Sequence, residues 1–261
     1  MDLQLAGKRV FISGSTQGIG YSVAAACAAE GASVVLNGRH EHRVIEAVER
    51  LRASTPGAQV SGIAADFAVP EQVRALVAEL GPVDVLVNNV GLFDVTPFTE
   101  VPDEEWLRYF DINVMSAVRL SRGVLDGMLA RGWGRIIFIG TESAVDVPGD
   151  MVHYGATKAA ALALSNGLAK LTKGTGVTVN TVLGGPTYSD GVASVVERIA
   201  TAQGLSPQDL KSSLVRDNSL IQRFIEPGEI ANVVTFLASP LSSATNGAAI
   251  RADGGVLPTI I

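Results

Sequence analysis

Tyr154 and Lys158 are the pair of residues in this sequence with the clearest chemical potential. On a helix, side chains four residues apart lie on one face, one turn from each other. A buried cation beside a phenol favours the phenolate, and so lowers a pKa that is ordinarily about 10. A tyrosine tuned in this way can exchange a proton with a carbonyl substrate near neutral pH.

Hydroxyl groups precede this pair. An apolar strand pattern at residues 136–139 breaks at Gly140, and Thr141 and Ser143 follow before the Ala-rich helix that carries Tyr154. Either hydroxyl can donate a hydrogen bond to a carbonyl oxygen. A tyrosine and a lysine at this spacing also fit a half-buried aromatic beside a solvated lysine, so the interpretation depends on the rest of the chain.

A glycine-rich turn near the start of the chain predicts a dinucleotide site. It follows an apolar run at residues 8–13 and precedes an Ala-rich helical pattern, with the spacing Gly-x-x-x-Gly-x-Gly. Such a turn lets a pyrophosphate approach a helix N-terminus, where free N–H groups favour an anion. The commonest fingerprint has Gly-x-Gly-x-x-Gly instead. We expect cofactor contacts from Gly14, Ser15, Thr16, Gln17, Gly18, Ile19 and Gly20.

The end of the second predicted strand, residues 33–37, favours NADP(H) over NAD(H). NAD sites usually have an acidic residue there, which binds the ribose hydroxyls and would repel a 2′-phosphate. This chain has Arg39, whose guanidinium can form paired hydrogen bonds with a phosphate. A solvated loop arginine is the alternative, and Glu41 could still reach a ribose, so the sequence leaves NAD open.

Strand and helix patterns alternate along most of the chain. They predict an α/β fold with a single domain over residues 1–261: a Rossmann-type, doubly wound, seven-stranded parallel sheet with helices on both faces. Strands are expected at residues 8–13, 33–37, 59–64, 84–87, 136–139, 177–182 and 248–251, and one long helix at residues 103–130. Residues 190–225 interrupt the alternation after the sixth strand, which predicts a helical lid over a pocket.

Composition and charge exclude several classes of function. The 261 residues are 47% hydrophobic and carry a net charge of −6 without a basic run. Nucleic acid and anionic membranes are therefore not expected as partners. The first residues include an acid where a signal peptide needs bases, and no run of about eighteen apolar residues occurs. We expect a cytoplasmic protein.

Together these motifs resemble those of the short-chain dehydrogenase/reductase family, over nearly the whole chain and in the family's order. The glycine turn resembles Thr-Gly-x-x-x-Gly-x-Gly, with Ser13 for the threonine, and residues 88–91, Asn-Asn-Val-Gly, resemble Asn-Asn-Ala-Gly. The resemblance implies catalytic roles for Asn113, Tyr154 and Lys158. It also implies cofactor contacts from Asp66, Phe67, Asn89, Gly91, Tyr154, Lys158, Thr187 and Ser189.

The chain departs from the family pattern in two places. The family's catalytic serine lies thirteen residues before the tyrosine, where this chain has Thr141; Ser143 lies eleven before it. Threonine keeps the hydroxyl, so we favour Thr141, with Ser143 as the substitute. The family's Pro-Gly after the sixth strand is Gly184-Gly185 here, which frees the backbone before Thr187 and Ser189.

The resemblance implies an NADP(H)-dependent oxidoreductase that interconverts a small-molecule ketone and a secondary alcohol. The cofactor would supply the hydride, Thr141 or Ser143 would hold the carbonyl, and Tyr154 with Lys158 would supply the proton. Asn113 would hold a water that relays protons, and no metal is needed. The family resemblance also implies a homo-oligomer, a tetramer or a dimer, joined through helices at residues 103–130 and 154–173.

Two other functions stay open at this point. A 3-oxoacyl-carrier-protein reductase would have to accept an acidic carrier, which the carboxylates expected near the mouth of the pocket would repel. These are Asp94, Glu142, Asp146 and Asp150. A non-catalytic NAD(P)-binding regulatory protein is the second alternative, kept open by the changed residues at positions 141 and 184. Six residues suggest an apolar substrate pocket, although core packing accounts equally well for several of them: Phe93, Val95, Val145, Val147, Met151 and Tyr188.

Overall fold

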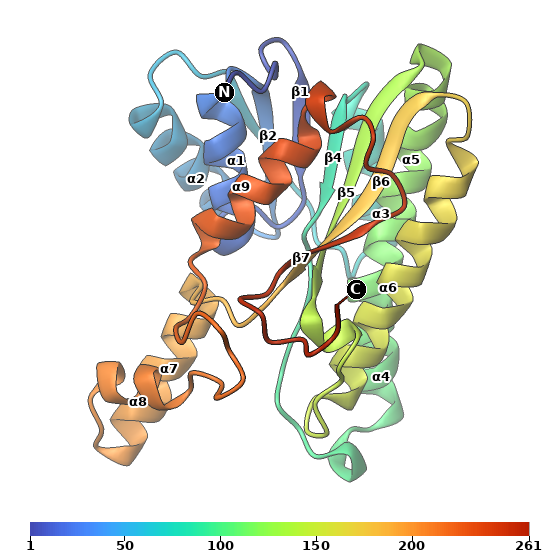
Figure 1. Ribbon diagram of the computed structural model, residues 1–261. Helices are drawn as coiled ribbons and strands as arrows, with labels where there is room; N and C mark the ends of the chain where they lie inside the picture. The colour runs from blue at the N-terminus through green and yellow to red at the C-terminus, as the bar shows by residue number, and fades with distance from the viewer. Residues whose placement is uncertain (261) are drawn as a thin grey trace.

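Seven parallel strands form one twisted sheet in the order β3-β2-β1-β4-β5-β6-β7 (Figure 1). The computed structural model describes residues 1–260, so Ile261, the last residue of the expected domain, lies outside the described part. The strands are β1 (Arg9–Ile12), β2 (Ser33–Gly38), β3 (Val60–Ala64), β4 (Val85–Asn88), β5 (Trp133–Thr141), β6 (Gly176–Gly184) and β7 (Ala249–Ala252). The predicted Rossmann-type fold is confirmed.

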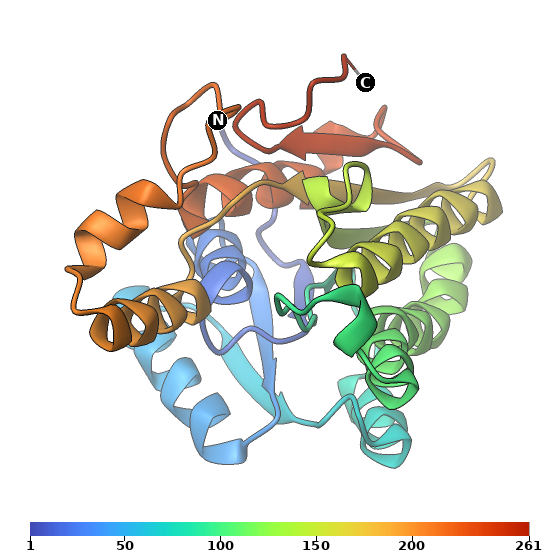
Figure 2. The same cartoon turned by 90° about the horizontal axis from the view of Figure 1, so that it is seen from below.

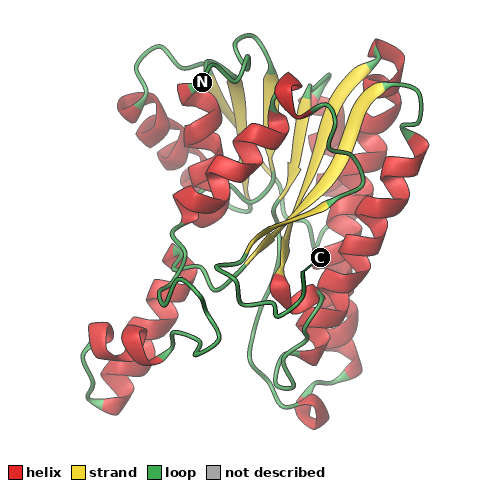
Figure 3. Cartoon of the chain, viewed as in Figure 1, coloured by secondary structure: helices red, strands yellow, loops and turns green. Residues whose placement is uncertain are grey.

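Helices cover both faces of this sheet (Figure 3). One face carries α1 (Gly18–Ala29), α2 (Glu41–Ser54) and α9 (Pro227–Ala238). The other carries α3 (Pro70–Leu80), α5 (Ser116–Arg131) and α6 (Val152–Leu171), with α4 (Asp103–Phe110) packed on α6. Short 3-10 turns lie at Phe98–Glu100, Glu142–Ala144 and Pro240–Ser242. The chain winds outward from β1 on one side and from β4 on the other, so a ligand is expected between the carboxyl ends of these two strands.

The core has two layers because both faces of the sheet are buried. Along β1, Val10 and Ile12 point into the layer under α1, α2 and α9, while Phe11 points into the opposite layer. All three side chains are fully buried. A strand buried on both faces favours apolar residues at successive positions, which explains the nearly continuous apolar runs of the central strands β1 and β4.

The long helix expected at residues 103–130 is interrupted. Between α4 and α5 the chain forms one π-helical turn, Asp111–Met115. Asn113 lies in this turn with its side chain buried and hydrogen-bonded outside its own helix. Wide turns of this kind are frequent at functional sites, because they change the direction of one side chain without ending the helix.

Strand β5 is longer than predicted. It does not break at Gly140 but continues to Thr141, which pairs with Gly184 of β6. A Cβ atom at Gly140 would lie 2.7 Å from the Cγ2 of Thr181 on the neighbouring strand. Packing between the two strands therefore requires glycine at position 140. Strand β5 ends at Thr141, which lies at the carboxyl end of the sheet.

The predicted lid forms two helices, α7 (Asp190–Gln203) and α8 (Pro207–Ser213), which project from one side of the molecule (Figure 2). They share a small apolar cluster of Val196, Ala200 and Leu210. No helix within residues 1–260 has both the length and the apolar character needed to cross a bilayer.

Candidate active site

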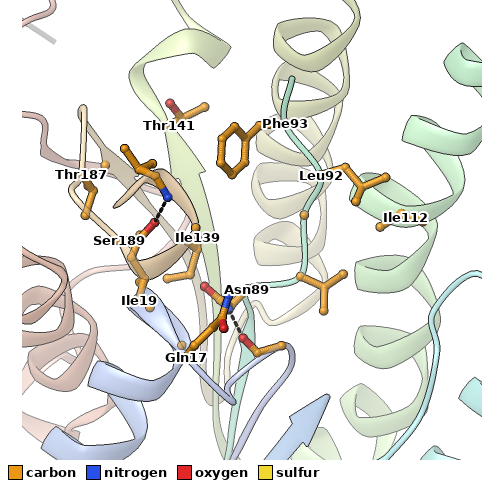
Figure 4. A pocket seen from close by; sticks show the side chains of 18 of the residues that line it. Gln17, Ile19, Asn89, Leu92, Phe93, Ile112, Ile139, Thr141, Thr187 and Ser189 are labelled. Atoms are coloured by element: carbon orange, nitrogen blue, oxygen red, sulfur yellow. Dashed lines mark hydrogen bonds between the residues drawn. The ribbon is translucent and has the colours of Figure 1, made fainter. Parts of the chain in front are cut away.

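One cavity of about 940 Å³ opens at the carboxyl ends of the strands, between the sheet and the lid. Figure 4 shows Gln17, Ile19 and Asn89 at one end of it, with Thr141 and Phe93 at the other. Most of the residues singled out in the sequence line this cavity: Gly14, Thr16, Gln17, Gly18, Ile19, Gly20, Arg39, Asp66, Phe67, Asn89, Gly91, Thr141, Ser143, Tyr154, Lys158, Thr187 and Ser189. Ser15 and Asn113 do not line it.

The glycine turn is held in shape by Asn89 from the end of β4. Its side-chain amide donates to the carbonyl oxygens of Ser13 (3.0 Å) and Gly14 (2.8 Å). Gly14 and Gly18 have φ near +60°, a conformation that favours glycine. A Cβ atom at Gly20 would lie 2.5 Å from the amide nitrogen of Asn89, so the turn and Asn89 fit together only with glycine there.

The turn already accepts an anion. The backbone N–H of Gly18, at the N-terminus of α1, donates to a carboxylate oxygen of Asp190 in the lid at 2.7 Å. Free N–H groups and the helix dipole favour negative charge at this position. The residues present therefore fit the pyrophosphate of a dinucleotide.

Ser15 has a different role from the one expected. It is fully buried, and its hydroxyl donates to Ile12 O (2.7 Å) and accepts from the backbone N–H of Asn37 (2.9 Å). These bonds tie the turn to β1 and β2. Ser15 was thus wrongly expected to face the cofactor, because its hydroxyl is engaged by the protein's own backbone.

Three basic or titratable side chains lie at the end of the cavity beside β2. Arg39 is exposed there, as expected, and His40 and Arg43 line the same region. The sequence analysis missed the last two, although Arg43 follows Arg39 by four residues. Arg43 Nη1 lies 3.7 Å from Glu46 Oε2 in an exposed ion pair. Such a pair contributes little to stability, so the Arg43 guanidinium stays accessible to a ligand.

Lys158 is buried, and its ammonium donates to the backbone carbonyl of Ile139 at 3.0 Å. Burial disfavours the charged form and lowers the pKa of Lys158 to about 8. Gly91 makes room for this side chain, since a Cβ atom there would lie 3.2 Å from the lysine Nζ. The lysine therefore stands at the junction of α6, β5 and the loop after β4.

Tyr154 lies with its ring centre 5.9 Å from the Lys158 ammonium. Burial raises the pKa of Tyr154, the Glu142 carboxylate raises it further, and a hydrogen bond with Thr141 lowers it in part. The expected lowering of this pKa by Lys158 is wrong for this structure, because desolvation of the phenolate outweighs the other contributions. The phenol stays protonated at neutral pH.

Thr141 and Ser143 both lie at the end of β5, but they are not equivalent. The Thr141 hydroxyl is the one that interacts with Tyr154. It also donates to Glu142 Oε2 at 2.5 Å, while the Ser143 hydroxyl donates to Glu142 Oε1 at 3.2 Å. This arrangement favours Thr141 as the hydroxyl that acts together with the tyrosine.

Asn113 joins two elements behind the cavity. Its side-chain oxygen accepts from Leu92 N (2.7 Å), and its amide donates to Leu92 O (3.0 Å) and to Thr157 Oγ1 (3.0 Å). Leu92 follows the Asn-Asn-Val-Gly segment, and Thr157 precedes Lys158 on α6. Asn113 thus fixes the loop after β4 against the helix that carries the tyrosine and the lysine.

The loop after β6 packs closely on the backbone beyond β7. A Cβ atom at Gly185 would lie 2.5 Å from the backbone oxygen of Asp253, so this position must be glycine. Beyond it, the Thr187 hydroxyl donates to Gly185 O at 2.8 Å, and Ser189 caps α7 through Val192 N. The backbone of this loop is also held by a hydrogen bond from Gly185 N to Ala252 O at 3.2 Å.

Some expectations about the substrate end were wrong. Phe93 and Met151 line the cavity, but the cavity lining does not include Val95, Val145, Val147 or Tyr188. Glu142 is not an exposed charge at the mouth: the residue is 3% exposed and lies inside the cavity with Arg216 from the lid. No sequence motif marks Arg216.

The low pKa of Lys158 is testable in the protein without added ligand. With ¹³C-labelled lysine side chains, one NMR resonance should titrate near pH 8. The ammonium loses its proton as pH rises through about 8 because the buried charged form is destabilised. Lys158→Met should remove this resonance and Lys173→Met should keep it. A lysine spectrum without a resonance that titrates near pH 8 would contradict the assignment.

Comparison with known proteins places this geometry in a family. Residues 8–200 match the family described as short chain dehydrogenase. The oxidoreductases YvrD and YvaG of Bacillus subtilis are 45% and 43% identical to the chain, and each match covers the full length of this chain and of the relative. The solved structure of L-sorbose reductase from Gluconobacter frateurii, complexed with NADPH and L-sorbose, is 35% identical, covers all of both chains and has a TM-score of 0.95. The chain therefore belongs to the short-chain dehydrogenase/reductase family of oxidoreductases.

Proposed function

We propose that the protein reduces a small-molecule ketone to a secondary alcohol with NADPH as cofactor, and catalyses the reverse reaction with NADP. The observation that carries this proposal is the meeting of Tyr154, Lys158 and Thr141 at one end of a cavity whose other end is an anion-accepting glycine turn. Two of these groups can act on a carbonyl oxygen, and the turn can hold a dinucleotide beside them.

The chain offers binding groups along the whole length of a dinucleotide. The glycine turn would hold the pyrophosphate, Asp66 and Phe67 would hold the adenine, and Lys158 would hold the nicotinamide ribose. Arg39, with His40 and Arg43 beside it, suits a 2′-phosphate. The NADPH present in the structure of L-sorbose reductase supports the same choice.

When bound, the cofactor supplies the hydride that reduces the carbonyl carbon. Thr141 would hold the carbonyl oxygen by a hydrogen bond, with Ser143 as the substitute. Tyr154 would donate the proton as negative charge develops on that oxygen. Its raised pKa suits this role, since the phenol remains protonated at neutral pH. Lys158 would stabilise the tyrosinate that is left.

Asn113 would support this chemistry mainly by position. Both N–H groups of its amide are already engaged, by Leu92 O and Thr157 Oγ1. A water that relays protons would therefore have to use the second lone pair of its side-chain oxygen or the Lys158 ammonium. The homo-oligomer, a tetramer or a dimer, and a cytoplasmic location stay predictions from the family resemblance.

Tyr154→Phe tests the proton donor. The change keeps shape and packing but removes the transferable proton, so ketone-dependent oxidation of NADPH should fall by ~10²–10⁴. NADPH affinity, measured by fluorescence titration, should stay near that of the wild type. Tyr21→Phe on α1, where Tyr21 stacks with Arg50, is the matched control and should keep full turnover. Wild-type turnover in Tyr154→Phe would exclude the proposed chemistry.

Thr141→Ala and Ser143→Ala test the two hydroxyls. Loss of a hydrogen-bond donor to the developing oxyanion should lower turnover by ~10²-fold in Thr141→Ala. Ser143→Ala should have a smaller effect, and Thr141→Ser should restore most of the activity because it restores the hydroxyl. The opposite ranking of the two alanine variants would assign the role to Ser143.

Arg39→Asp tests the cofactor preference. It replaces a charge-assisted hydrogen bond to the 2′-phosphate by repulsion, so the Kd for NADPH should rise by at least ~10-fold while the Kd for NADH changes little. Both constants can be measured by fluorescence titration. Arg74→Asp on α3, where Arg74 pairs with Glu71 on the surface, is the control. Equal losses for the two cofactors would rule out the NADP assignment.

A further inference from the structure

Glu142 places a buried carboxylate directly beside the proposed carbonyl site. The residue follows the last residue of β5, is 3% exposed and lines the cavity. Its two oxygens accept hydrogen bonds from the hydroxyls on either side in the sequence, Oε2 from Thr141 at 2.5 Å and Oε1 from Ser143 at 3.2 Å. Both candidate catalytic hydroxyls therefore direct their protons to the same carboxylate.

Arg216 brings a compensating charge from the lid. Its Nη2 lies 3.1 Å from Glu142 Oε1, and its side chain is 35% exposed and lines the same cavity. Within residues 1–260, no other carboxylate forms an ion pair with Arg216. A buried charge needs such a partner. The pair presents acceptor oxygens and donor N–H groups to the cavity at zero net charge.

Binding of a carbonyl group must change this arrangement. Thr141 can donate its one proton either to Glu142 or to a substrate carbonyl, but not to both. When the proton turns to the carbonyl, Glu142 Oε2 loses a donor, and a buried acceptor left without its partner is costly. A substrate that brings its own hydroxyl donor to this oxygen removes that cost.

The distances allow the required hydroxyl to lie on the carbon next to the carbonyl. A carbonyl oxygen held by Thr141 lies ~2.8 Å from Oγ1, and Glu142 Oε2 lies 2.5 Å from the same Oγ1. A hydroxyl on the carbon next to the carbonyl is then within reach of the carboxylate. A ketone without a hydroxyl offers no donor, and a carboxylate on that carbon would meet the charge of Glu142.

We propose that Glu142, held by Arg216, is a specificity-determining residue that selects neutral ketones with a hydroxyl group on the carbon next to the carbonyl. This inference rests on the proposed reductase function and adds the class of substrate. The exchange of one hydroxyl donor for another at Glu142 Oε2 is the physical basis of the selection.

Hydroxyacetone and butanone test the proposal, because they have the same number of non-hydrogen atoms and differ only by a hydroxyl in place of a methyl. The quantity measured is the ratio of their kcat/KM values with NADPH. The wild type should prefer hydroxyacetone, and Glu142→Gln should lower this ratio by ~10–100-fold, the range for a hydrogen bond to a charged group. The intrinsic reactivities of the two ketones cancel when ratios are compared between variants.

Arg223→Gln is the matched control. Arg223 also belongs to the segment between β6 and α9, but its guanidinium pairs with Glu229 on the outer surface, and it does not line the cavity. This variant should keep the wild-type ratio. Arg216→Gln should lower the ratio, since Glu142 then loses the partner that holds it. Circular dichroism establishes that each variant is folded.

A second measurement uses the wild type alone, so it does not depend on the folding of a variant. Propane-1,2-diol should inhibit the reduction of hydroxyacetone at least ~10-fold more strongly than butan-2-ol, because only the diol has the second hydroxyl. Equal inhibition, or an unchanged ratio in folded Glu142→Gln, would overturn the proposal and leave Glu142 as a tie between β5 and the lid.

The outcomes also separate this inference from the proposed function. If the wild type reduces butanone as efficiently as hydroxyacetone, the reductase function stands and the selection by Glu142 is wrong. If it oxidises NADPH with neither ketone nor with any member of a broad ketone panel, the proposed function fails and this inference fails with it.

Discussion

The buried ammonium of Lys158 is the constraint on which the arrangement of the site depends. A desolvated cation is costly, so its surroundings must supply oxygen partners and space. The carbonyl oxygen of Ile139 accepts a hydrogen bond from the ammonium, and Gly91 leaves space for it because glycine has no side chain. Because these groups come from β5 and from the loop after β4, α6 can dock only where both strands end. Asn113 holds the loop after β4 against α6 through hydrogen bonds with Leu92 and Thr157.

Much of the fold could be predicted from the sequence because its signals are local. Continuous apolar runs mark strands buried on both faces, and their alternation with helical patterns implies a parallel sheet. The missed details depend on distant partners. The π turn at Asp111–Met115 directs Asn113 to groups 21 and 44 residues away. The extension of β5 past Gly140 depends on Thr181 of the next strand, which no local pattern contains.

The site, too, combines features that the local sequence predicts with features that depend on distant residues. The glycine turn, Arg39, Tyr154 and Lys158 belong to short motifs, and the structure brings them to one cavity. Spacing alone could not predict the direction of the Tyr154 pKa shift, since burial rather than the neighbouring lysine dominates it. Nor could it predict the pair of Glu142 and Arg216, which are 74 residues apart in the sequence and meet only because the lid returns over the end of β5.

The lid contacts both ends of the cavity beside positions that ligands would occupy. Asp190 occupies the N–H of Gly18, where a pyrophosphate would bind, and Arg216 contacts Glu142, where a substrate hydroxyl would bind. Within the described part of the lid, the apolar cluster shared by α7 and α8 is small. An element with little buried apolar surface opens at low cost in free energy. Cofactor binding would exchange one anion for another at Gly18, and substrate binding would exchange one hydroxyl for another at Glu142. The first exchange would release Asp190 and free the lid at the cofactor end. The second would leave Arg216 on Glu142 Oε1, because only the donor to Oε2 changes, so the lid would stay held at the substrate end.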